Sequence, residues 1–332
     1  MRLVTFSDGS SERVGALLDD DTIVDLVAGR AELVPDAAPV ADTMIGLLAD
    51  WDAALPVMCE VLGAARDRVG NGARPAALVD RSAVRLLAPV PRPPRIRDYL
   101  TYEQHAAGSG MKMSPAFEQM PICYKGNPFT VVGPDAELDW PAYSDQLDFE
   151  LELGFYVAGT GVDLSVDEAA RHVAGVTIFN DVSARDIQML EMSMMIGPSK
   201  SKDFCNVMGP CLTTIDEIDE FAIELVARVN GEEWARGTSA GRRYSFAEVL
   251  AWASYAEPLV PGEFLAVGTV GGGCGLELNR WIEPGDVVEL EASGIGVLRN
   301  TVGAKQIAVP GVGLASYRGA ARFAPRGATP AE

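Results

Sequence analysis

Apolar and acidic residues alternate along one short segment in the middle of the chain. The apolar side chains stand at every second position, at Leu147, Phe149, Leu151, Leu153 and Phe155. Because side chains along a β-strand point alternately to its two faces, this period of two predicts a strand over residues 147–157. Asp148, Glu150 and Glu152 then share the face opposite to the apolar residues.

The rest of the chain contains one long helical pattern and several strand patterns. Residues 40–70 carry apolar side chains at helical spacing, which predicts helix there. A capping box formed by Ser165 and Glu168 predicts another helix, which ends at Gly175. Short apolar runs predict strands within residues 1–30, 81–87, 175–180, 222–229, 264–270 and 287–290.

A proline-rich segment divides these patterns into two regions. Four prolines fall within residues 88–95, and so many prolines cannot lie inside a helix or a central strand. We therefore expect a small N-terminal α+β domain over 1–87, a semi-rigid linker over 88–95 and a larger domain over 96–332. The fold class is α+β and predominantly β. No G-x-G-x-x-G follows a strand and no P-loop is present, which disfavours nucleotide-binding folds.

The composition limits the binding partners and the cellular compartment that we expect for this protein. The 332 residues carry a net charge of −20, which repels nucleic acid and means that an anionic substrate needs a local cation. No apolar run is long enough to span a membrane and no signal-peptide pattern begins the chain, so we expect a cytoplasmic protein. The five cysteines are odd in number and form no C-x-x-C pair, which indicates reduced packing residues. Two histidines make a histidine-rich zinc site improbable.

The acidic face of the predicted strand has two interpretations. Charged residues commonly line a strand face that is exposed to solvent. Here, however, no cation occurs between Gln146 and Arg171, so Asp148, Glu150 and Glu152 repel one another. A hard cation such as Mg²⁺, Mn²⁺ or Ca²⁺ would relieve that repulsion, because these ions prefer oxygen ligands.

A second polar segment follows the apolar run that ends at Phe179. Polar residues at the end of a strand often line a site, and here they open onto a predicted helix. One of Asn180, Asp181 and Ser183 can cap that helix. Capping requires only one residue, so three polar side chains remain available for a site, namely Asp181, Arg185 and Gln188.

Five segments taken together resemble the fumarylacetoacetate hydrolase superfamily, in its longer two-domain type. The resemblance covers roughly residues 95–300, and the segments occur in the order found in the family. They are Asp98-Tyr with His105, Leu-Asp-Phe-Glu-Leu-Glu (147–152), Asn-Asp-Val-Ser-Ala-Arg-Asp-Ile-Gln (180–188), Gly-Pro-Ser-Lys-Ser-Lys-Asp-Phe (197–204) and Gly-Leu-Glu-Leu (275–278). The resemblance implies a mixed β-sheet roll and a homodimer.

The resemblance also implies roles for individual residues. The expected ligands of a divalent metal, Mg²⁺ or else Mn²⁺ or Ca²⁺, are Asp98, Glu150, Glu152 and Asp181. The expected catalytic residues are His105, its orienting partner Glu277, and Lys202. The expected substrate-binding residues are Tyr124, Lys125, Arg185, Gln188 and Thr269. Asp148 matches no ligand and is assigned a structural role.

These residue types suit the cleavage of a carbon–carbon bond in a small anionic 1,3-diketo acid. A hard cation polarises both carbonyl oxygens, and a neutral His105 held by Glu277 removes a proton from water. We therefore expect a metal-dependent hydrolase of acylpyruvate or fumarylacetoacetate-like acids. The alternatives are a 2-oxo acid decarboxylase or isomerase of the same superfamily, and a non-catalytic protein with a structural Ca²⁺ ion.

Two features separate this chain from the enzyme that cleaves fumarylacetoacetate. Met192 stands where that enzyme has a tyrosine, and Lys112 stands near its flexible arginine. Met189, Met192, Met194 and Met195 form a pliable pocket wall or, in the interpretation that we favour, part of the core.

Gly108, Ser109 and Gly110 are candidate hinges of a mobile lid that runs from His105 to about Met120.

Overall fold

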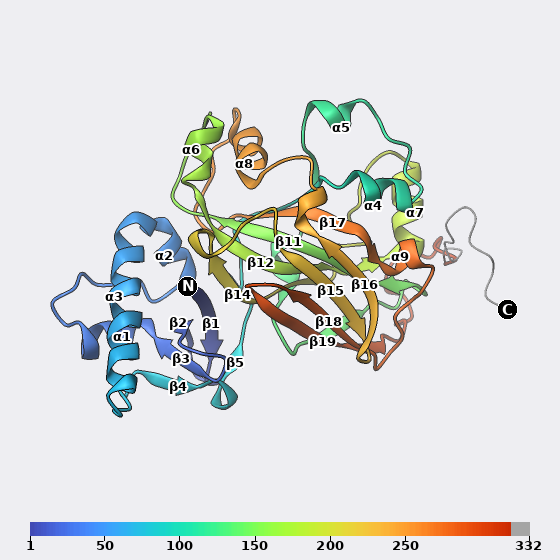
Figure 1. The fold of residues 1–332 in the computed structure, drawn as a ribbon. Coiled ribbons are helices and arrows are strands. Elements are labelled where there is room, and N and C mark those ends of the chain that lie inside the picture. Colours follow the sequence, from blue (N-terminus) through green and yellow to red (C-terminus); the bar gives the residue numbers. More distant parts are fainter. Residues whose placement is uncertain (320–332) are drawn as a thin grey trace.

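One long mixed sheet runs through the molecule and joins its N-terminal region to the acidic segment (Figure 1). The computed structural model describes residues 1–319, and within them the sheet has twelve strands. The order is β4-β3-β2-β1-β14-β12-β11-β17-β6-β7, with β5 beside β1 and β8 beside β14. The strands after the N-terminal region are β6 (Ile96–Leu100), β7 (Ile122–Gly126), β8 (Val131–Val132), β11 (Glu150–Val157), β12 (Val173–Asp181), β14 (Asn206–Thr214) and β17 (Phe264–Cys274).

The N-terminal region continues this sheet and covers part of it with helices. β1 pairs with β14 through Arg2 opposite Thr213, so the sheet is continuous across the expected domain boundary. The helical pattern over 40–70 is confirmed as two helices, and the division at 88–95 stays a prediction about independent folding. The elements are β1 (Arg2–Ser7), β2 (Glu12–Leu17), β3 (Thr22–Asp25), α1 (Leu26–Leu33), α2 (Met44–Ala49), α3 (Trp51–Gly70), β4 (Leu78–Asp80) and β5 (Arg85–Leu86).

A second sheet packs against the large one. Within the described residues it has five strands in the order β16-β15-β18-β19-β9. Leu151, Leu153 and Phe155 of β11 enter the same apolar cluster as Leu225 and Leu290 of the smaller sheet. The strands are β9 (Glu137–Trp140), β15 (Glu224–Val229), β16 (Glu232–Thr238), β18 (Val287–Ala292) and β19 (Gly296–Lys305). This sheet-rich architecture confirms the predicted α+β, predominantly β fold.

The predicted strand over 147–157 is interrupted at Phe149. Asp148 belongs to the short β10, which pairs with β13, whereas the chain from Glu150 onward is β11 in the large sheet. Every residue of β11 is buried, because the opposite face meets a cavity at one end and an apolar cluster containing Tyr156 at the other. The interpretation of the acidic face as exposed to solvent is therefore wrong. The short strands are β10 (Leu147–Asp148) and β13 (Ser183–Ala184).

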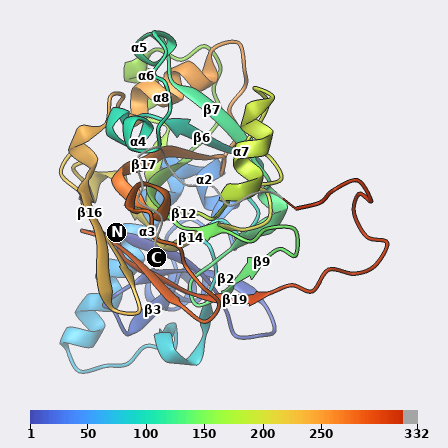
Figure 2. The same cartoon turned by 90° about the vertical axis from the view of Figure 1, so that its right-hand side faces the viewer.

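Six further helices complete the described part of the chain, and α4 and α7 lie close to the ends of β6 and β17 (Figure 2). The capping box of Ser165 is confirmed, but its helix ends at Ala170 because β12 begins at Val173. The predicted strand over 81–87 is reduced to β5. The helices are α4 (Glu103–Gly108), α5 (Ala116–Gln119), α6 (Val166–Ala170), α7 (Arg185–Ser193), α8 (Phe246–Ser254) and α9 (Gly275–Leu278).

Two expectations from composition can be compared with this fold. None of the helices in residues 1–319 combines the length and the apolar character needed to cross a membrane. All five cysteines lie within these residues and are free thiols. Cys59 is exposed, so the expectation that every cysteine packs in the interior is wrong for that residue.

Candidate active site

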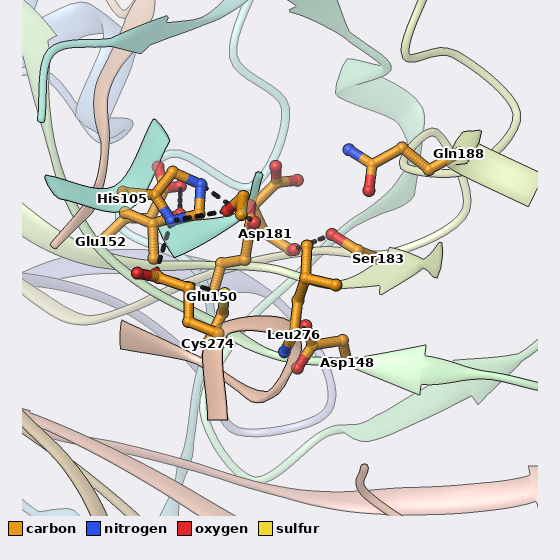
Figure 3. Close-up of polar contacts among 12 residues, drawn as sticks. His105, Asp148, Glu150, Glu152, Asp181, Ser183, Gln188, Cys274 and Leu276 are labelled. Atoms are coloured by element: carbon orange, nitrogen blue, oxygen red, sulfur yellow. Dashed lines mark hydrogen bonds and ion pairs between the residues drawn. The ribbon is translucent and has the colours of Figure 1, made fainter. Parts of the chain in front are cut away.

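Three buried carboxylates meet where the large sheet approaches α4 and α7. Asp98 lies on β6, Glu152 on β11 and Asp181 at the end of β12. One oxygen from each residue lies within 4.8 Å of the others. β17 separates β6 from β11, and β12 pairs with β11, so neighbouring strands deliver the three side chains to one point. Glu152 and Asp181 are labelled in Figure 3. We call the three residues the carboxylate trio.

The carboxylate trio fits a hard divalent cation. Among the described residues, the buried oxygens Asp98 Oδ1, Glu152 Oε2 and Asp181 Oδ1 have no hydrogen-bond partner. Burial, reinforced by the neighbouring carboxylates, raises the pKa of Asp98 and of Glu152 well above their usual values. Buried carboxylate oxygens without partners are costly, and a cation bound by these oxygens relieves that cost. An oxygen-only ligand set suits Mg²⁺, Mn²⁺ or Ca²⁺.

Glu150, the fourth expected ligand, lies beside the trio but is held by cations of the protein. Arg185 Nη2 lies 2.7 Å from Glu150 Oε1, and Lys202 Nζ lies 2.5 Å from Glu150 Oε2. Burial opposes ionisation of Glu150, but the neighbouring cations Arg185 and Lys202 outweigh it and lower the pKa of this carboxyl group. Glu150 therefore carries a negative charge that two cations share. Its role as a metal ligand stays a prediction.

Lys202, Arg185 and Gln188, which the sequence assigned to catalysis and substrate binding, form a network with these acids. Lys202 also bonds to Asp181, and Arg185 Nη1 donates to Gln188 Oε1 at 2.8 Å. Arg185 is the first residue of α7, whose N-terminus has no side-chain cap, so the capping interpretation of Asn180, Asp181 and Ser183 is wrong. Asn180 Oδ1 instead accepts from the Glu150 backbone amide at 3.1 Å.

His105 and Glu277 form a hydrogen-bonded pair beside Glu150. His105 Nδ1 lies 2.7 Å from Glu277 Oε1, and His105 Nε2 lies 3.8 Å from Glu150 Oε1 (Figure 3). The Gly272 amide donates to Glu277 Oε2 at 2.9 Å, which fixes that carboxylate. A carboxylate at Nδ1 favours the tautomer with a proton on Nδ1, and Nε2 is then free to accept a proton.

Two of the three remaining substrate-binding candidates join the carboxylate trio. Tyr124 donates to Asp181 Oδ2 at 2.6 Å, and Thr269 donates to Glu152 Oε1 at 2.8 Å. Lys125 follows Tyr124 on β7 and therefore points away from it. Its side chain is 63% exposed and lies 4.0 Å from Glu257. The structure does not bring Lys125 into the site.

A cavity of about 670 Å³ opens to solvent and is lined by His105 and by three of the acids, Asp98, Glu150 and Glu152. Lys112 lies in its wall, and among the residues that the structure describes it forms no ion pair. Met189 and Met192 also line the cavity, whereas Met194 and Met195 are 74% and 94% exposed. The interpretation of these methionines as core is therefore wrong, and the pocket-wall alternative holds for the first two.

Sequence reasoning missed two polar contacts of this site. Ser109 Oγ lies 3.5 Å from His105 Nδ1, one helical turn after the histidine, and that spacing was the available signal. Cys274 Sγ lies 3.5 Å from Glu277 Oε1, and burial raises the pKa of its thiol well above the usual value. Cys274 is therefore a neutral neighbour of the pair.

Comparison with known proteins identifies the family. The family described as fumarylacetoacetate (FAA) hydrolase C-terminal matches residues 95–303. The chain belongs to this family. The oxaloacetate tautomerase YisK of Bacillus subtilis (strain 168) is 30% identical to this family member over 300 residues, which are 87% of this chain and 96% of YisK. The resemblance seen in the sequence is thus confirmed.

Solved structures share the fold of this fumarylacetoacetate hydrolase family member. The 5-carboxymethyl-2-hydroxymuconate delta-isomerase from Mycobacterium smegmatis is 23% identical, with a TM-score of 0.67 over 91% of this chain and 99% of that one. A maleylpyruvate hydrolase from Sphingobium sp. SYK-6, in complex with manganese(II) and pyruvate, is 22% identical. Its TM-score is 0.68 over 92% of this chain and 100% of that one.

Proposed function

We propose that this protein is a divalent-metal-dependent tautomerase of a small 2-oxo dicarboxylic acid such as oxaloacetate. The observation that carries the proposal is the position of His105. His105 lines the same cavity as Asp98 and Glu152, whose Oδ1 and Oε2 atoms have no hydrogen-bond partner among the described residues. YisK is named an oxaloacetate tautomerase and matches this chain over 96% of its own length, which supports this substrate class.

The proposed reaction moves one proton between carbon and oxygen. A cation bound by the carboxylate trio would polarise the 2-oxo group and acidify the neighbouring carbon. His105 Nε2 takes the proton from that carbon and returns it to the oxygen, while Nδ1–H stays bonded to Glu277. No water is consumed and no carbon–carbon bond breaks. The metal, Mn²⁺ or Mg²⁺, belongs to this proposal together with its expected ligands Asp98, Glu150, Glu152 and Asp181.

Lys112 supports a substrate with a second carboxylate. Of the cations that line the cavity, Arg185 and Lys202 are each paired with two buried acids. Lys112 forms no ion pair within residues 1–319, so its ammonium group can meet a carboxylate far from the metal. A protein with a net charge of −20 needs such a local cation to retain a dianion.

Tautomerisation replaces carbon–carbon hydrolysis as our leading interpretation. The His105–Glu277 pair serves either reaction, because both begin with removal of a proton. YisK, which matches over most of both chains, is named a tautomerase, and this favours the isomerase alternative. A non-catalytic Ca²⁺ site leaves the His105–Glu277 pair in the same cavity without a purpose. The expected homodimer stays a prediction, supported by the exposed Met194, Met195 and Ile196.

The experiment compares two reactions of one Mn²⁺-loaded sample. Loss of the enol absorbance of oxaloacetate reports tautomerisation, and pyruvate release from an acylpyruvate reports cleavage. We expect the first reaction to have a kcat/KM at least about 100-fold above that of the second, which corresponds to ~2.7 kcal/mol of transition-state discrimination. A higher kcat/KM for acylpyruvate cleavage would return hydrolysis to the leading position.

A further inference from the structure

Asp148 is fully buried and accepts hydrogen bonds from both halves of the site. Its Oδ1 accepts from the Gly275 amide at 2.7 Å, and its Oδ2 accepts from the Leu276 amide at 2.9 Å. Arg185 Nε donates to the same Oδ2 at 2.8 Å. Figure 3 shows Asp148 beside Leu276, on the side of the site away from His105. The carboxylate thus joins β10 to α9 and to α7.

The contact with α9 leads to the catalytic histidine. Gly275 and Leu276 are the first two residues of α9, and the next residue, Glu277, bonds to His105. A Cβ at Gly275 would lie 2.5 Å from Asp148 Oδ1 and 2.1 Å from the carbonyl oxygen of Arg280. Only glycine therefore allows the backbone to approach the carboxylate this closely. The start of α9, and with it Glu277, is fixed against Asp148.

The contact with Arg185 leads to the metal side of the site. Arg185 presents Nε to Asp148 and Nη2 to Glu150, so one planar guanidinium spans the two acids. Glu150 in turn shares Lys202 with Asp181 of the carboxylate trio. The position of these charges therefore depends on how Asp148 holds the guanidinium.

We propose that Asp148 is a positioning residue that sets the His105–Glu277 pair through α9 and the Glu150 carboxylate through Arg185. The inference rests on the proposed function, because both halves of the site must act on one substrate. It assigns to Asp148 a role beyond packing. An amide cannot replace the carboxylate, since asparagine offers one acceptor oxygen and turns an NH₂ group toward a donor. Either the α9 amides or Arg185 then lose their acceptor.

The test uses Asp148→Asn with Asp186→Asn as its matched control. Asp186 is also a buried carboxylate that accepts from a hydroxyl and from backbone amides, and within residues 1–319 its partners are Ser144, Asp145 and Ile187. At saturating Mn²⁺ we expect Asp148→Asn to lower kcat for oxaloacetate by about 10–100-fold with KM nearly unchanged, as for partners that orient a catalytic group. The control should retain the wild-type kcat.

A double substitution separates positioning from general damage. If Asp148 acts on kcat through His105, adding Asp148→Asn to His105→Ala should cost less than about 3-fold, because the effects of coupled residues do not add. Arg185→Lys keeps the α9 contacts of Asp148. It should weaken Mn²⁺ binding without moving the nuclear magnetic resonance signal of the His105 Nδ1–H. Arg185→Lys also serves as the second variant if Asp148→Asn gives no soluble protein.

Nuclear magnetic resonance supplies a readout that does not depend on activity. The chain has only two histidines, and His172 Nδ1 lies 2.7 Å from the Ala158 carbonyl oxygen, far from the site, so it is an internal reference. We expect Asp148→Asn to shift or remove the downfield Nδ1–H resonance of His105 and to leave that of His172 in place. The proposal is overturned if the His105 resonance and kcat both stay at wild-type values, or if the loss in kcat is as large in the His105→Ala background. A wild-type protein without activity on oxaloacetate would refute the proposed function, while the resonance would still test Asp148.

Discussion

Glu277 Oε1 lies 2.7 Å from His105 Nδ1, and this contact decides which nitrogen of the ring is available for chemistry. Because the carboxylate receives the Nδ1 proton, Nε2 is left with an unshared electron pair. Asp98 and Glu152 of the carboxylate trio line the same cavity as His105, so a substrate held there lies close to the imidazole. The cavity thus contains both a base and oxygen ligands.

Removal of the imidazole should abolish most of the activity without disturbing the metal site. His105→Ala should lower the rate of oxaloacetate tautomerisation by about 10²–10⁴-fold, the usual contribution of a positioned acid–base group. Mn²⁺ affinity, measured by calorimetry, should change little. His172→Ala is the control, because His172 bonds to Ala158 and lies outside the cavity. Equal losses in the two variants would contradict the assignment of His105 as the base.

The orienting role of Glu277 makes a distinct prediction. Glu277→Gln keeps the shape of the side chain but presents an amide that cannot bind the Nδ1 proton with the strength of a carboxylate. We expect kcat to fall by about 10–100-fold, in the range found for partners that fix a histidine. Steady-state kinetics at saturating Mn²⁺ measure the change. Wild-type kcat in Glu277→Gln would show that the tautomer of His105 is set by another group.

The carboxylate trio should bind the metal. Asp181→Asn removes one charge and gives a direct measure of its contribution, and we expect Mn²⁺ affinity to fall by at least about 10-fold, which is ~1.4 kcal/mol. Asp203→Asn is a suitable control, since Asp203 is an acid close to Lys202 in sequence but outside the trio. Manganese electron paramagnetic resonance reports the free ion directly. Unchanged affinity in Asp181→Asn would remove this residue from the ligand set.

The stabilisation that the metal provides should depend on pH. Burial and neighbouring acids raise the pKa of Asp98 and Glu152 above the values in the unfolded chain, so the metal-free fold loses stability as pH rises from about 4 through the raised pKa values. A bound cation removes this loss and competes with protons at low pH. The increase in Tm on adding Mn²⁺ should therefore grow with pH. An increase that is constant or that shrinks with pH would contradict this account.

Lys112 should select for the second carboxylate of the substrate. Lys112→Ala should raise KM for oxaloacetate by about 10-fold or more, the effect of losing ~1.4 kcal/mol of charged contact, and leave kcat nearly unchanged. Lys125→Ala is the control, because Lys125 is exposed outside the cavity. A 2-oxo acid with one carboxylate should be turned over equally by wild type and Lys112→Ala. A change in kcat alone would assign Lys112 to the chemistry instead.

The sequence predicted the acidic segment and the family, because both depend on local patterns. It did not predict the break at Phe149, since pairing of Asp148 with β13 depends on residues far along the chain. Side chains alternate along β7, so Lys125 points outward while its neighbour Tyr124 reaches the site. Which of the two faces the site depends on how β7 pairs with β6, and the sequence alone does not show that register. The sharing of Glu150 between Arg185 and Lys202 is likewise a tertiary arrangement.

The residue types of the site do not by themselves distinguish tautomerisation from hydrolysis. Tautomerisation and hydrolysis both use a base and a cation, and they differ in access of a water molecule to the substrate. No pattern of residues along the chain encodes that access. The relationship to an oxaloacetate tautomerase favours tautomerisation, and the geometry around His105 is consistent with that proposal.

The central claim is that a metal held by the carboxylate trio and the base His105 together tautomerise a 2-oxo dicarboxylic acid. The most direct measurement follows the enol absorbance of oxaloacetate in chelator-treated protein during titration with Mn²⁺, with bound Mn²⁺ counted in the same samples. We predict that activity is absent without metal and rises in proportion to occupancy of one site per chain. Full activity in the metal-free protein, or full occupancy without activity, would contradict the account.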